Sequence, residues 1–182
     1  MTATFSSTSS TSSTDTTRTD TGEAPSFRDL GVAKKLDQAL RREGVTAPFP
    51  IQAQTVPHTL AGRDLCGRAP TGSGKTLAFA IPLVENATAG ESRRPTALVL
   101  APTRELATQI RDVVLPLAKA RGRWVASFTG GTNIKRDVER LKRGVDIAVA
   151  TPGRLADLVQ RGDVHLGDVR VVVLDEADRM AD

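Results

Sequence analysis

The sequence contains very little cysteine and few aromatic side chains. The 182-residue chain has one Cys, no Tyr and 3% aromatic residues. A single cysteine excludes a disulfide scaffold and is typical of a reducing compartment, so we expect a cytoplasmic protein. So few rings also exclude a surface that binds nucleic acid mainly by stacking bases on aromatic side chains.

Long apolar runs and an N-terminal targeting signal are also absent. No run approaches the roughly 18 residues that a membrane-spanning helix needs. The N-terminus has neither the basic start nor the apolar stretch of a signal peptide, so we expect no membrane partner. The balance of 25 basic and 21 acidic residues, net +4, permits a polyanionic partner without requiring one.

The first 24 residues differ in composition from the rest of the chain. About two-thirds of residues 1–22 are Ser or Thr. Such a segment cannot bury enough surface to offset the entropy of ordering, which predicts a disordered tail. A phosphorylated or partner-binding tail is the alternative. Residues 25–182 are predicted to form one domain.

Helical patterns alternate with short apolar runs along residues 25–182. The strands are short and unbroken, as in a parallel sheet that helices cover on both faces, and the pattern predicts an α/β fold. Cys66, inside one expected strand, is predicted to be a buried small apolar group. The expected strands are 64–68, 97–101, 124–129, 146–150 and 169–174, and the expected helices are 33–43, 51–61, 74–89, 104–120, 133–143 and 152–161.

A glycine-rich segment with the sequence APTGSGKT follows the first expected strand and opens a helix. Gly72 and Gly74 let the backbone turn its N–H groups toward an anion, and Lys75 supplies a positive charge for the outer phosphates. The Thr76 hydroxyl can bind Mg²⁺. A turn that only caps a helix is the alternative, but it does not need the intact GSGKT with both flanks. The predicted phosphate loop comprises Pro70, Thr71, Gly72, Ser73, Gly74, Lys75 and Thr76.

Two adjacent carboxylates end the last expected strand, within the sequence VVVLDEAD of residues 171–178. Ligands of open α/β sheets bind where buried strands end. Asp175 can therefore hold a metal ion, and Glu176 can polarise a water molecule. A solvated acidic turn is the alternative, which the phosphate loop about 100 residues upstream disfavours.

Together these two motifs resemble the DEAD-box family of RNA-dependent ATPases and helicases, whose name residues 175–178 spell. The resemblance runs from Phe27 to the end of the chain and implies a RecA-like phosphate-loop domain. Further segments occur in family order: GVTAPFPIQ at 44–52, PTRELA at 102–107, the pair Gly130-Gly131, and TPGR at 151–154.

The resemblance implies a role for each motif. Gln52 would hydrogen-bond the adenine of ATP and Phe27 would pack on it, although a surface glutamine and a helix-start staple are the alternatives. Lys75, Asp175 and Glu176 would act on ATP, with Mg²⁺ near Thr76 and Asp175. For TPGR, a capped helix start is compatible with phosphate binding. The implied contacts to the RNA backbone are Pro102, Thr103, Arg104, Gly130, Gly131, Thr151, Pro152, Gly153 and Arg154.

Family members continue beyond the acidic motif with a Ser-Ala-Thr strand and a second RecA-like domain. The resemblance places that strand between the phosphate-loop strand and the acidic-motif strand. We therefore expect an incomplete N-terminal half of an ATP-dependent RNA helicase, nearly inactive by itself. A passive ATP-dependent RNA clamp and a generic phosphate-loop ATPase are the alternative functions.

Overall fold

The computed structural model describes residues 25–70 and 72–180, and its centre is a parallel four-stranded sheet. The strand order is β2-β3-β1-β4, so the chain makes crossover connections as it builds the sheet. All neighbouring strands run parallel, which confirms the predicted α/β class. The strands are β1 (Ala97–Leu100), β2 (Val125–Phe128), β3 (Ile147–Ala150) and β4 (Val171–Leu174).

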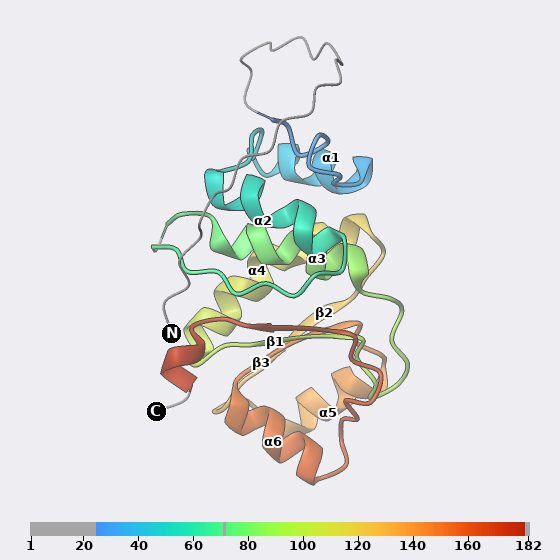
Figure 1. Cartoon of the computed structure of the whole chain (residues 1–182). Helices are drawn as coiled ribbons and strands as arrows, with labels where there is room; N and C mark the ends of the chain where they lie inside the picture. Colours follow the sequence, from blue (N-terminus) through green and yellow to red (C-terminus); the bar gives the residue numbers. More distant parts are fainter. Residues whose placement is uncertain (1–24, 71, 181–182) are drawn as a thin grey trace, which may run out of the picture.

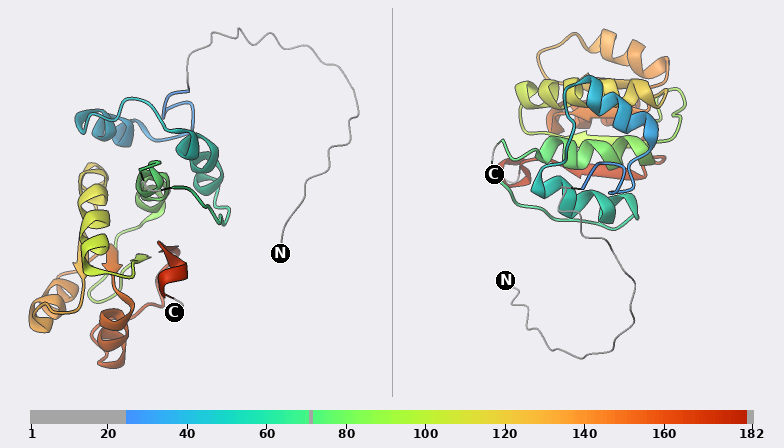
Figure 2. Two further views of the ribbon diagram at one scale, coloured as in Figure 1. Left: turned by 90° about the vertical axis from the view of Figure 1, so that its left-hand side faces the viewer. Right: turned by 90° about the horizontal axis from the view of Figure 1, so that it is seen from above.

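Helices cover both faces of the sheet (Figure 1). On one side α3 and α4 lie against the strands, and α1 and α2 form a further layer outside them, as the two views of Figure 2 also show. On the opposite side lie α5 and α6. The helices are α1 (Lys34–Arg42), α2 (Pro50–Leu60), α3 (Lys75–Asn86), α4 (Arg104–Ala120), α5 (Ile134–Lys142) and α6 (Pro152–Gln160).

The hydrophobic core is divided by the sheet into two clusters. One cluster joins the inner strand residues Val99 and Val149 to the apolar faces of α1, α3 and α4. The other joins Leu98 and Ala148, which directly precede those two valines in the chain, to α5 and α6. Successive strand residues point to opposite faces, so both faces of β1 and β3 must be apolar. This explains the unbroken apolar runs in the sequence.

A buried carboxylate fixes the loops at the amino ends of the strands. One Asp146 oxygen accepts from the Gly90 backbone N–H (2.6 Å), and the other accepts from the Trp124 N–H (2.7 Å). A Cβ on Gly90 would lie 2.8 Å from the Val145 carbonyl oxygen, so a side chain does not fit there. Asp146 therefore joins the segments that enter β1, β2 and β3.

The strand expected at residues 64–68 is not formed, and this prediction is wrong. The backbone of 63–70 has no strand structure, and Leu65 and Cys66 are exposed rather than buried. A strand is defined by its hydrogen-bonded neighbour. In the described part of the chain, β4 lies at the edge of the sheet and pairs only with β1. The expected tail at 1–24 lies outside the described residues.

None of the described helices is both long and apolar enough to cross a lipid bilayer.

Candidate functional site

The phosphate loop leads directly into α3 and folds back on itself. Gly74 is the N-cap of α3 and has φ +84°, a conformation that favours glycine. The Lys75 ammonium donates to the Ala69 carbonyl oxygen (2.7 Å), and the Ser73 hydroxyl donates to the Pro70 carbonyl oxygen (2.7 Å). The loop thus holds a cation at a helix N-terminus, where backbone N–H groups and the helix dipole attract anions. Thr71 lies outside the described residues.

The N-terminus of α2 supports the phosphate loop from the side. The Gln52 side chain, 1% exposed, donates through Nε2 to the Gly74 carbonyl oxygen (3.0 Å). Its Oε1 accepts from the Phe49 backbone N–H (2.9 Å). A Cβ on Gly74 would lie 2.5 Å from Gln52 Nε2 and 2.6 Å from Phe49 Cδ2. Gly74 is therefore required both by its φ angle and by the close approach of α2.

The acidic motif begins where β4 ends. The Asp175 backbone N–H donates to the Leu100 carbonyl oxygen (3.0 Å), which extends the pairing of β4 with β1 by one residue. Burial and the neighbouring Glu176 charge raise the pKa of Asp175 above its usual value, while the Lys75 charge lowers it. Since α3 packs against β4, the phosphate-loop lysine and this carboxylate belong to neighbouring elements.

Glu176 has a strained backbone and an ion-paired side chain. Its φ is +51°, in the left-handed region that side chains other than glycine rarely adopt. Its carboxylate accepts from Arg179 Nη1 (2.6 Å) across the 3-10 turn Ala177–Met180. Strain of this kind concentrates at functional sites, where the surrounding structure maintains it.

The residues at this edge fit a magnesium ion that is shared with phosphates. Within 25–70 and 72–180, no group of three or more His, Cys, Asp and Glu side chains could form a closed metal cage. Mg²⁺ does not require one, because it is usually held by one or two carboxylates together with substrate phosphates and water. Asp175 and the half-buried Thr76 provide that kind of donor set.

The nine residues expected to contact RNA gather at the same edge of the sheet. They occupy the connections that leave β1, β2 and β3, and the carboxyl ends of parallel strands share one edge. Thr103 caps α4, because its hydroxyl accepts from the Leu106 N–H (3.2 Å). The Arg104 guanidinium lies against Gly131, where a Cβ would be 2.5 Å from Nη1. Thr151 occupies the N-cap position of α6 and Pro152 is its first residue, but the Thr151 hydroxyl makes no cap bond, so the expected side-chain cap is not formed.

Arg154 is held by Asp137, a buried acid that lies outside the motifs identified in the sequence. Asp137 on α5, 1% exposed, pairs with Arg154 and lies 3.8 Å from Arg140. Arg154 also donates to the Thr132 carbonyl oxygen (2.9 Å). Asp137 and Leu141 are four residues apart and share the buried face of an otherwise basic helix. That helical spacing was the signal that could have identified Asp137.

Phe27 is the predicted site residue that the structure places away from the site. Its ring is fully buried and belongs to the core cluster on the α1 side of the sheet. It offers no exposed face to a base. The Gln52 amide is likewise used within the chain, so a base contact by either residue stays a prediction.

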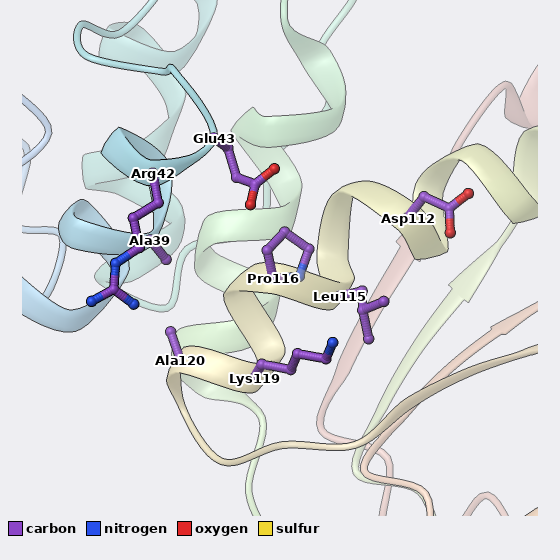
Figure 3. A pocket seen from close by; sticks show the side chains of 8 residues that line it. All are labelled: Ala39, Arg42, Glu43, Asp112, Leu115, Pro116, Lys119 and Ala120. Atoms are coloured by element: carbon purple, nitrogen blue, oxygen red, sulfur yellow. The ribbon is translucent and has the colours of Figure 1, made fainter.

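A separate cavity of about 480 Å³ lies between α1 and α4 (Figure 3). Its charged lining residues are two of each sign, namely Arg42, Glu43, Asp112 and Lys119. A lining with equal numbers of positive and negative side chains favours neither anionic nor cationic ligands. No residue of the phosphate loop or the acidic motif lines this cavity.

A parallel α/β sheet with a phosphate loop before α3 and a carboxylate at the end of β4 defines a phosphate-loop nucleotide-binding domain. The model of the DEAD/DEAH box helicase family matches residues 49–182, and the chain belongs to that family.

Known relatives agree with this assignment. The chain is 43% identical over 164 residues to "DEAD-box ATP-dependent RNA helicase 9, mitochondrial" of Arabidopsis thaliana, covering 87% of this chain and 27% of the relative. It is 45% identical over 156 residues to "ATP-dependent RNA helicase DeaD" of Escherichia coli K12, covering 85% and 25%. The chain thus spans about a quarter of the length of these curated relatives.

A solved structure shows the same fold. The crystal structure of the RNA helicase Prp28 from Chaetomium thermophilum bound to ADP superposes with a TM-score of 0.78 at 40% sequence identity. The match covers 85% of this chain and 39% of that one. This likeness confirms the predicted RecA-like helicase fold.

Proposed function

We propose that this chain is the ATP-binding half of an ATP-dependent RNA helicase, in which ATP hydrolysis is coupled to local opening of RNA duplexes. The observation that carries the proposal is the packing of α3, which begins at the phosphate loop, against β4, which ends at the acidic motif. Names of relatives such as the E. coli helicase support the same activity. Because the chain spans only part of those relatives, the activity is proposed for the protein as a whole.

The phosphate loop would bind the phosphates of ATP. The Lys75 ammonium would leave the Ala69 carbonyl and turn to the outer phosphates, and the first N–H groups of α3 would bind them too. Asp175 and Thr76 would hold Mg²⁺, which neutralises charge on the phosphates when it is bound. Glu176 would orient the attacking water and accept its proton through the carboxylate that now pairs with Arg179.

RNA would bind by its backbone at the ends of β1, β2 and β3. Arg104 is exposed, Gly131 exposes its backbone beside it, and the N-terminus of α6 presents further N–H groups. These groups recognise phosphates and sugars rather than base edges. Asp137 would act as a positioning residue, because it fixes Arg154 beside Thr132.

The test of the catalytic proposal is phosphate release by the helicase that carries this domain, with and without single-stranded RNA. RNA is expected to stimulate hydrolysis, and Lys75→Ala is expected to abolish it because the outer phosphates lose their cation. Lys119→Ala is the matched control, since it removes an equal charge from an exposed position on α4. Binding of ATP and RNA without any phosphate release would favour a passive clamp instead.

The RNA face is tested by titrating the 182-residue chain with two single-stranded RNAs of unrelated sequence. Both are expected to bind alike, with an affinity that falls steeply as salt rises. Arg104→Ala is expected to weaken both equally and to reduce the salt slope by about 1. A marked preference for one sequence would contradict backbone recognition.

A further inference from the structure

The helix α5 carries a concentration of positive charge that the proposed site does not use. Residues 134–143 include five basic and two acidic side chains, whereas the chain as a whole is nearly balanced, with 25 basic and 21 acidic residues. One of the two acids, Asp137, is buried on the inner face of the helix, where it pairs with Arg154. The outer surface of α5 is therefore strongly basic, and such a surface favours a polyanionic partner.

Three arginines share one face of this helix. Arg136, Arg140 and Arg143 are separated by four and three residues, a spacing that places them on the same side of an α-helix. Together with Glu139 they line a hollow of about 270 Å³. A water molecule occupies about 30 Å³ of liquid, so the hollow has room for a phosphate group. Its lining carries three positive charges and one negative charge.

Two of these arginines have no carboxylate partner in the described part of the chain. Arg140 lies 3.8 Å from the buried Asp137, whereas no carboxylate of residues 25–70 and 72–180 lies within 4 Å of Arg136 or Arg143. Both side chains are exposed. A guanidinium presents a planar fork of N–H donors that matches two phosphate oxygens at once. The hollow therefore suits a phosphate group.

The helix leads away from the edge of the sheet where RNA is proposed to bind. α5 begins three residues after Gly131, at the carboxyl end of β2, and is followed by β3, so it runs back along the sheet. It lies on the side opposite α3 and α4 (Figure 1). Arg136 is consequently near the RNA-facing edge, and Arg143 lies about 10 Å further along the helix.

We propose that Arg136, Arg140 and Arg143 form a second binding surface for the RNA backbone, which continues from the edge of the sheet along α5. RNA is the polyanion that fits best, because its phosphates are regularly spaced and the proposed RNA-facing turn directly precedes the helix. Contacts to phosphates carry no sequence preference. The inference rests on the proposed function, since the RNA must also bind at the edge.

The test measures the affinity of the 182-residue chain for two single-stranded RNAs, of about 5 and about 16 nucleotides. Arg136→Ala combined with Arg143→Ala is expected to weaken binding of the longer RNA by about 5- to 10-fold and to reduce its salt slope by about 1 to 2. The shorter RNA, bound at the edge alone, is expected to be unaffected. Lys34→Ala combined with Lys35→Ala is the matched control, because it removes two exposed charges from α1 on the opposite side of the sheet.

The outcomes separate this inference from the proposed function. Unchanged binding of the longer RNA by the α5 variant, while Arg104→Ala weakens both RNAs, would overturn the inference and leave the RNA-binding edge intact. A natural chain that binds neither RNA would overturn the proposed function itself. If the α5 variant lost affinity for poly-glutamate but not for RNA, the partner of this surface would be an acidic protein, and the inference would be wrong.

Discussion

At the scale of single residues, two buried acidic side chains stabilise this domain although no sequence motif contains them. Asp137 and Asp146 are buried acids that fix an arginine and two backbone N–H groups, respectively. Asp146 belongs to no motif, whereas the helical spacing between Asp137 and Leu141 could have identified Asp137. Lys75 and Asp175 were predicted from the chemistry of phosphate and magnesium binding, and their roles stay predictions.

Glu176 provides a test of strain at the site. Both Glu176→Gly and Glu176→Ala remove the carboxylate, but only glycine adopts φ +51° without cost. We expect the Gly variant to have a free energy of unfolding about 1 kcal/mol higher than the Ala variant, measured by urea denaturation. Equal stabilities would show that the left-handed conformation is relaxed in the natural protein.

Asp175 provides a test of electrostatics. Its raised pKa means that the folded chain binds this proton more tightly than the unfolded chain does. The resulting stabilisation is present below the usual value of 3.8 and is lost as the pH rises through the folded-state pKa, so the charged form opposes folding at neutral pH.

Asp175→Asn is therefore expected to raise the Tm at pH 7 and to weaken the pH dependence of stability just above pH 3.8. The same change at the exposed Asp157 of α6 is the control and should leave both properties unchanged. A lower Tm for Asp175→Asn at pH 7 would contradict this assignment.

At the scale of elements, the helices and four of the five expected strands were predictable from periodicity and from their end signals. The expectation at 64–68 failed because apolar residues define a strand only when a partner lies beside it. Cys66 was misplaced for the same reason. Local sequence left both a base contact and a packed staple open for Phe27, because full burial depends on tertiary packing that the residues of this segment do not determine alone.

The two faces of the edge strand β4 differ in burial, and this difference can be tested by mutation. Val173 packs against the core, whereas Val172 is 55% exposed on the opposite face. Val173→Ala is expected to lower the free energy of unfolding by about 1 to 2 kcal/mol, because it removes buried methyl groups. Val172→Ala should change it by less than about 0.5 kcal/mol. Equal costs in urea denaturation would mean that β4 is covered on both faces.

At the scale of the whole molecule, the proposed functional residues of the sequence motifs lie at the end of the sheet where the strands have their carboxyl ends. The acidic motif and the RNA-facing turns follow parallel strands, whose carboxyl ends lie together, and the phosphate loop is brought to them by the packing of α3 against β4. The sequence predicted that the acidic motif lies where a buried strand ends, which is where open α/β sheets bind ligands. It did not predict the bracing of the loop by α2, which depends on contacts between side chain and backbone.

The central claim is that ATP is held with its phosphates at Lys75 and its magnesium at Asp175. The most direct measurement is the ATP affinity of the 182-residue chain and its variants with and without Mg²⁺. We predict that Lys75→Ala lowers affinity roughly 10- to 100-fold in both conditions, whereas Asp175→Asn lowers it only when Mg²⁺ is present. The account would be contradicted if the natural chain bound no ATP at millimolar concentration, or if Asp175→Asn left the magnesium dependence unchanged.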